Sequence, residues 1–331
     1  MKQSELFFLL AACASSILGQ TPANGEYRLA LPDHKGKLTW SADGFKIIEN
    51  SAKANGRELG VRGRDASGQV TFLGFLFLAP ETAPMTSAKC RDAAVAQEKK
   101  TNATLKIART FEIPRPGGLP VAMVAHTTAN RDGSTMYRVR GFVATGDMCG
   151  DLEFYSSKAI SDEDADLKKV FLSYRLDANY TPQFSDVVLY AQVLFLHHDY
   201  RAAAPIFEKG LTMVPSGGAP FTSATVARRI MRDQAGMSYG ISGDLAKSRS
   251  IFEKGIADDP DYPLNYYNLA CADASEKRLS DARLHLKQAF DRKANMNPGE
   301  SMPIPTQDDS FLPYKNNREF WTFLQGLKAG Q

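Results

Sequence analysis

The chain has 331 residues, which at roughly 150 residues per domain predicts two domains. Hydrophobic residues make up 43% and charged residues 23%, a globular composition that excludes a disordered or collagen-like chain. The formal net charge of +3 is too small for a protein dedicated to binding nucleic acid.

The first residues have the pattern of a secretory signal peptide. Lys2 precedes an apolar run over residues 6–14, and small residues follow it; the run is shorter than the roughly 20 apolar residues that span a bilayer. We expect residues 1–20 to be removed and the mature chain to be exported to the periplasm or the extracellular space. A buried N-terminal helix is one alternative. The run also ends in Leu10-Ala11-Ala12-Cys13, which is similar to the lipobox of bacterial lipoproteins, so anchoring through a lipidated Cys13 is another.

Export makes a disulfide possible, because thiols pair in oxidising compartments. Cys90 and Cys149 fall in one predicted domain, but pairing needs Cα atoms within about 7 Å, so it stays open at this point. Cys271 lies between two alanines in a predicted helix and is expected to be a buried small residue. No C-x-x-C occurs, and the five histidines lack metal-ligand spacing. We therefore expect no metal and no cofactor.

Residues 21–178 are predicted to form an α+β domain. Apolar and polar residues alternate over 105–113, as in a half-buried strand, and a turn at 115–118 predicts a hairpin with 121–125. The run 72–78 is apolar throughout, as in a central strand. Helices are expected over 87–100 and from Ser161, so the order is roughly three strands, a helix, three strands and a helix. This order predicts a mainly antiparallel sheet with two helices and is similar to that of the Mog1/PsbP-like fold, without implying a function.

An internal repeat marks the second half of the chain. The pentapeptide Ile-Phe-Glu-Lys-Gly at 206–210 recurs 45 residues later at 251–255, and a third, looser copy follows the second by 34 residues. In all three copies, positions spaced by four and three lie on one helical face, and in the first two a proline five residues further on ends the helix. The repeated positions are Ala203, Phe207, Gly210 and Pro215; Ser248, Phe252, Gly255 and Pro260; and Ala282, Leu286 and Ala289. First-helix counterparts are Gly236, Tyr239, Tyr266, Leu269 and Ala270.

This spacing, with small and aromatic residues and a closing proline, resembles the tetratricopeptide repeat (TPR). The resemblance implies that residues 179–328 form antiparallel helix pairs followed by a capping helix around 317–324, with an all-α, TPR-like fold. About eleven extra residues separate the first two units, and 215–220 is where we place them. Phe320, Phe323 and Leu324 are expected to cover the last pair.

The resemblance also implies a concave surface lined by the first helix of each pair, the usual binding face of such repeats. A rotation of about 100° per residue places Asp233 and Met237 of the second pair on that side, with Tyr267 and Cys271 of the third. One acid, soft apolar groups and an aromatic ring favour an extended or helical segment of a protein or peptide. The alternative is that this face packs against the α+β domain.

No nucleotide-binding, serine-hydrolase or zinc-protease signature occurs in the sequence. The clearest polar candidates of the α+β domain, Arg109, His126, Arg138 and Arg140, are spread over predicted strands without a recognisable constellation. We therefore predict an exported, non-catalytic protein-binding module with no catalytic residue, no nucleic-acid partner and no transmembrane segment in the mature chain. The alternative is an enzyme or small-ligand-binding protein centred on the α+β domain.

Overall fold

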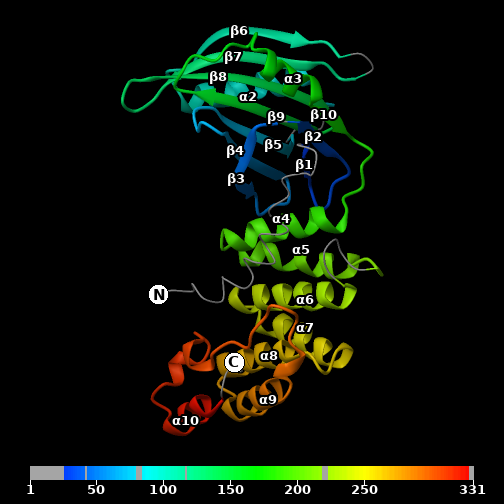
Figure 1. The fold of residues 1–331 in the computed structure, drawn as a ribbon, viewed down its shortest axis with the longest axis vertical. Coiled ribbons are helices and arrows are strands. Elements are labelled where there is room, and N and C mark those ends of the chain that lie inside the picture. The colour runs from blue at the N-terminus through cyan, green and yellow to red at the C-terminus, as the bar shows by residue number, and fades with distance from the viewer. Residues whose placement is uncertain (1–25, 42, 80–83, 116–117, 218–222, 328–331) are drawn as a thin grey trace. The chain divides into compact units, whose positions relative to one another are not determined.

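A computed structural model describes residues 26–41, 43–79, 84–115, 118–217 and 223–327 (Figure 1). The predicted signal peptide and Cys13 lie outside these residues. The chain divides into two compact units between Asp186 and Val187. We call them the α+β unit and the helical unit.

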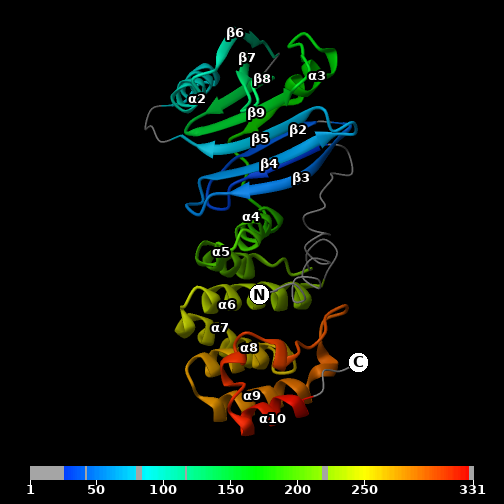
Figure 2. The same ribbon diagram turned by 90° about the vertical axis from the view of Figure 1, so that its left-hand side faces the viewer.

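The α+β unit is built on a seven-stranded antiparallel sheet (Figure 2). Its strand order is β3-β4-β5-β9-β8-β7-β6, and a second sheet has the order β1-β2-β10. The strands are β1 (Glu26–Ala30), β2 (Lys37–Ser41), β3 (Phe45–Ala52), β4 (Glu58–Asp65), β5 (Thr71–Leu78), β6 (Lys106–Ile113), β7 (Val121–Ala129), β8 (Thr135–Thr145), β9 (Met148–Ser156) and β10 (Arg175–Asp177).

The main features of this sheet match the predicted antiparallel α+β fold, but the element order differs. The apolar run in β5 is paired on both sides, by β4 and β9, and β6 forms the predicted hairpin with β7. The expected order of three and three strands was wrong, since among the described elements five strands precede α2 (Ser87–Thr101), four lie between α2 and α3 (Ala165–Ser173), and β10 follows α3. Both edge strands, β3 and β6, carry a register shift, and such bulges hinder further pairing at a sheet edge.

Two helices belong to this unit. Helix α2 (Ser87–Thr101) contacts β7, β8 and β9, and α3 (Ala165–Ser173) contacts β2. Helix α3 begins later than Ser161, because the Asp164 side chain accepts hydrogen bonds from the backbone N–H groups of Asp166 and Leu167 and so caps the helix. Its apolar stripe ends at Tyr174, which packs edge-on against Trp40 with ring centroids 6.3 Å apart.

The helical unit consists of successive antiparallel helices. They are α4 (Phe184–Leu196), α5 (Tyr200–Met213), α6 (Ala224–Ile241), α7 (Leu245–Asp258), α8 (Pro263–Ser275), α9 (Leu279–Asp291) and α10 (Arg318–Gly326). Phe195 of α4 contacts Phe207 of α5, and α6 packs on α7 as α8 packs on α9. The helices are therefore arranged as three pairs plus a last helix.

The repeated positions lie where neighbouring helices meet. Gly236 of α6 faces Phe252 of α7, and a Cβ atom at this glycine would collide with the phenyl ring. Pro215 and Pro260 are exposed and follow their helices by two residues, where a proline cannot interrupt helical hydrogen bonds. A Cβ atom at Gly210 would lie 3.3 Å from Sδ of Met231, and the half-buried Tyr239 donates a hydrogen bond to Glu208. The other repeated residues are buried: Ala203, Phe207, Ser248, Phe252, Gly255, Tyr266, Leu269, Ala270, Ala282, Leu286 and Ala289.

The last helix covers the third pair. Phe320 and Leu324 of α10 are buried in one apolar cluster with Leu286 and Ala289 of α9, and Phe323 is partly buried beside them. Arg283 of α9 lies over the ring of Phe323. Helix α10 thus shields an apolar face of the third helix pair.

Candidate protein-binding site

The first helices of the second and third pairs, α6 and α8, lie side by side. Asn268 of α8 donates a hydrogen bond to the carboxylate of Asp233 on α6. Tyr267 and Cys271 lie on α8, one helical turn apart, and the half-buried Met237 lies on α6. We call this surface the inner face. Its residues are those that helical rotation predicted for a binding groove.

The chain's own C-terminal segment lies on the inner face. We call residues 293–314 the strap; they return from α9 past α8 to α6 before α10 begins (Figure 1, orange). Arg229 of α6 donates hydrogen bonds from Nη1 to the backbone oxygen of Asn295, at 3.1 Å, and to Oδ1 of Asn297, at 3.2 Å. The docking of the strap depends on contacts with residues far away in the chain.

Arg229 is held in position by other groups. Its guanidinium donates from Nε to Asp259 at 2.6 Å and lies over the ring of Tyr262, 4.5 Å from the centroid. The hydroxyl of Tyr262 in turn donates to Glu300 of the strap at 3.1 Å. A paired, stacked guanidinium has lost much of its rotamer freedom, so Arg229 is preorganised to bind a carbonyl oxygen.

A second set of contacts surrounds Asp308 of the strap. The hydroxyl of Tyr267 donates to Oδ2 of Asp308 at 3.0 Å, and Sγ of Cys271 lies 3.9 Å from the same oxygen. Phe311 packs edge-on against Tyr267, with ring centroids 6.0 Å apart. Tyr267 is only 1% exposed. The strap therefore covers the groove position where Tyr267 was expected to face a partner.

Asp233 is a buried acid beneath the strap. Its side chain is 8% exposed, and burial, followed by the negative charge of Glu300, raises its pKa to about 8, against the opposing hydrogen bond from Asn268. Two carboxyl groups thus share a site of low polarity. The Asp233 carboxyl is mostly protonated at neutral pH.

The α+β unit contains a second cluster of polar residues, which the sequence did not reveal. Arg140 of β8 donates to Glu98 of α2 at 2.6 Å and to Asp151 of β9 at 2.5 Å, and Arg138 donates to Glu153. The ring of His126 lies 3.5 Å from Glu98. The expectation of scattered candidates was therefore wrong for three of the four: β7, β8 and α2 bring His126, Arg138 and Arg140 together around the same acids.

This cluster has the properties of a structural ion network. Arg140, Asp151 and Glu153 are each less than a tenth exposed. Burial raises the pKa of Glu153, although Arg140 and Arg138 oppose that shift. The nearest cavity, about 220 Å³ in volume, is lined by Arg109 and Asp162 as well as by His126 and Arg138; Arg109 pairs there with Asp162 and Glu163. The charged groups compensate one another around Arg140.

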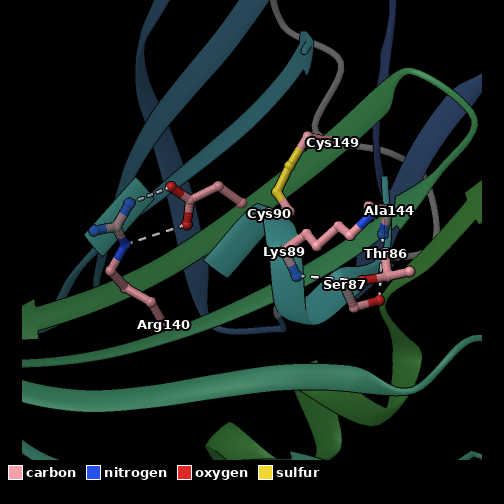
Figure 3. The surroundings of a disulfide bond; sticks show 8 residues. Thr86, Ser87, Lys89, Cys90, Arg140, Ala144 and Cys149 are labelled. Carbon is pink, nitrogen blue, oxygen red and sulfur yellow. Dashed lines mark hydrogen bonds and ion pairs between the residues drawn. A yellow bond between two sulfur atoms is a disulfide. The ribbon is translucent and has the colours of Figure 1, made fainter. Parts of the chain in front are cut away.

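The cysteine pair lies near the start of the same helix. Cys90 of α2 and Cys149 of β9 are joined at a Cα separation of 6.1 Å (Figure 3). The backbone N–H of Ala144 donates to the side chain of Ser87 beside them, at 3.3 Å. Helix α2 buries little apolar surface, so it is attached through the cysteine pair at its start and through Glu98 near its end.

Neither a metal site nor a membrane-spanning helix is found among the described residues. Within the ranges that the structure describes, no three His, Cys, Asp or Glu side chains are grouped so that they can hold a metal ion. No helix in this part of the chain is both long and apolar enough to cross a membrane.

Comparison with solved structures finds chains of low overall similarity. The type III secretion translocator chaperone SycD of Yersinia enterocolitica is 14% identical with a TM-score of 0.29, over 44% of this chain and 90% of that one. The TPR domain of Sgt2 from Aspergillus fumigatus is 16% identical with a TM-score of 0.30, over 46% and 87%. MamA from Desulfovibrio magneticus is 16% identical with a TM-score of 0.31, over 44% and 75%.

No protein-family model matches the sequence, and a search of curated proteins finds no match. The evidence for TPR-like helix pairs is therefore the repeat spacing and the packing of this chain. The similarity of the α+β unit to the Mog1/PsbP-like fold stays a prediction.

Proposed function

We propose that this chain is an exported, non-catalytic interaction module that binds a protein or peptide through the inner face of its TPR-like helices. The observation that carries the proposal is the strap: the inner face already holds a stretch of polypeptide through Arg229, Tyr262 and Tyr267. Arg229 is a preorganised donor for a backbone oxygen, and Tyr267 offers an aromatic contact to a side chain. A surface with these two groups is suited to bind a polypeptide segment of another protein. Asp233, Met237 and Tyr267 are the proposed partner-binding residues.

The test introduces an arginine on either side of the third helix pair and compares the two variants. Cys271→Arg places a long cation on the inner face, whereas Leu284→Arg places it on α9 at a position that is 54% exposed. Partner recovery by the mature chain from its native extracellular or periplasmic fraction should fall at least tenfold with Cys271→Arg and stay unchanged with Leu284→Arg. Equal recovery by both variants would contradict binding at the inner face. Crosslinks from the partner to α6 and α8 give the site directly.

Export is tested separately by the mass of protein isolated from its native host. We expect the mature chain to lack residues 1–20 and to comprise an α+β domain over 21–178 and repeats over 179–328. Retention of Met1 on exported protein would contradict the signal peptide. A diacylglyceryl group on Cys13 would support the anchored alternative.

A further inference from the structure

We propose that the strap is an internal ligand of the inner face, and that the external partner presents an acidic side chain three residues before an aromatic one, as Asp308 and Phe311 do. The proposal depends on the proposed function, because it names the chemistry of the segment that the same face binds. The partner and the strap would then compete for one surface.

The receptor for this pair of side chains is built from α8. Tyr267 donates its hydroxyl hydrogen to Asp308 and presents its ring to Phe311, so one buried residue contacts both members of the pair. The backbone N–H of Ser310 donates to Oδ1 of Asp308 at 2.8 Å. This local turn directs the acid and the aromatic ring toward the same helix and accounts for their spacing.

The acid is received by neutral donors. Its partners on α8 are a tyrosine hydroxyl and, at 3.9 Å, the Cys271 thiol. An ionised carboxylate only accepts hydrogen bonds, and both of these groups donate them. The site therefore fits a carboxylate, whereas a lysine or arginine at the same place would bring only donors.

Arg229 supplies a contact that does not depend on the side chains of the bound segment. It donates to the backbone oxygen of Asn295, which precedes Asp308 by 13 residues in the strap. A main-chain contact combined with one side-chain receptor is the usual division between affinity and specificity in the binding of extended peptides. The inner face can thus bind another polypeptide segment that follows the same path as the strap along α6 and α8.

Several features of the strap favour its displacement. It lies between α9 and α10 and contains only short 3-10 turns, whereas Met302 and Phe311 anchor it in the apolar cluster that also holds Leu286 and Phe320. Glu300 also brings a second acid toward the buried Asp233, where Tyr262, Cys271 and Arg229 are the other titratable or charged groups. A partner without an acid at the place of Glu300 would lower the cost of ionising Asp233.

The first experiment measures binding of a fluorescein-labelled peptide with the sequence of residues 301–314 to the mature full chain. A tethered strap competes at an effective concentration on the order of millimolar, so the wild type should bind this peptide weakly. Asp308→Ala should bind it at least tenfold more tightly. Asp309→Ala, the exposed neighbour, should behave as the wild type. A peptide with alanine in place of Phe311 should lose at least tenfold in affinity.

The second experiment closes the strap covalently. Asp308→Cys places a thiol beside Cys271, and oxidation should join them. The oxidised protein should bind the peptide at least tenfold more weakly than the same protein after reduction. Asp309→Cys receives the same treatment and should show no such difference, which controls for reduction of the Cys90–Cys149 pair.

The outcomes separate the two proposals. Equal peptide affinity in the wild type, Asp308→Ala and the oxidised Asp308→Cys protein overturns the internal ligand. A second outcome also overturns the internal ligand: the peptide binds none of these three proteins, but the native partner is still recovered through the inner face. In that case the proposed function remains supported. If Asp308→Ala does not fold, hydrogen exchange of the wild type decides: strap amides must exchange at least a hundredfold faster than those of α8, and exchange at equal rates overturns the proposal.

Discussion

The two units of this chain are stabilised by different kinds of contact. In the α+β unit, links between residues far apart in sequence attach α2 to the sheet: Cys90 with Cys149, and Glu98 with Arg140. In the helical unit, most packing joins a helix to the next one along the chain, as Gly236 does with Phe252. The comparison teaches that a helix with little apolar surface needs a few strong attachments, whereas repeated small and large residues distribute stability over many contacts.

The largest effect is expected from breaking the ion network of the α+β unit. Arg140→Met leaves the buried Asp151 and Glu153 and the half-buried Glu98 without their central cation, and removing one partner of a buried ion pair costs about 3–5 kcal/mol. Arg109→Met, which removes an exposed ion pair with Asp162, should change stability by less than about 1 kcal/mol. Urea unfolding followed by Trp40 fluorescence in a Trp321→Phe background measures both. Similar effects for both variants would contradict the network's structural role.

The next effect tests the covalent attachment of α2. Replacing Cys90 and Cys149 by serine opens a loop with a sequence separation of 59, for which loss of the disulfide should lower the free energy of unfolding by about 3 kcal/mol. The same fluorescence measurement applies. Alkylation of the unreduced native protein is the control: it should label only Cys271, and labelling of all three mature cysteines would show that the pair does not form.

A smaller effect is expected from a single packing change in the helical unit. Gly236→Ala places a methyl group against the Phe252 ring, and overpacking of this kind costs about 1–3 kcal/mol. Gly326→Ala adds the same group in α10, where no atom lies within 4 Å, and should be neutral or slightly stabilising. Thermal unfolding followed by helical circular dichroism compares them. An unchanged midpoint for Gly236→Ala would mean that the helices do not approach so closely.

An effect that depends on pH is expected from the buried acid of the inner face. Because the pKa of Asp233 in the folded chain is raised to about 8, the folded state holds its proton more tightly than the unfolded state. Stability should therefore fall as pH rises from about 4 to about 8. Asp233→Asn should remove this dependence and be more stable than the wild type by several kcal/mol at pH 8, with little difference at pH 4. Parallel stability–pH curves for the two proteins would contradict the burial of an ionisable acid.

Local patterns predicted most elements of both units. Strand alternation identified the β6–β7 hairpin and the apolar β5, because periodicity reports which face of a strand is buried. The two missed strands at the start, β1 and β2, are only five residues long, too short for a clear period. Helix α3 began later than predicted because the Asp164 carboxylate, and not the Ser161 hydroxyl, caps it.

For the inner face too, the sequence predicted what depends on neighbouring residues and missed what depends on distant ones. Helical rotation placed Asp233, Tyr267 and Cys271 on one side, since 3.6 residues per turn follows from the backbone alone. Their sequence did not show that residues 293–314 cover them. That result depends on side chains more than 30 positions apart, such as Tyr267 and Asp308.

What the sequence by itself determined is the repeat spacing, the class of each unit and the direction in which helix side chains point. These follow from backbone geometry and from residues that are neighbours along the chain. The tertiary structure alone decided that Arg140 lies opposite Glu153 in the β8–β9 register, that Cys90 reaches Cys149, and that the strap fills the groove. Each of these requires two distant segments to meet, and the energy of such contacts depends on burial that no local pattern specifies.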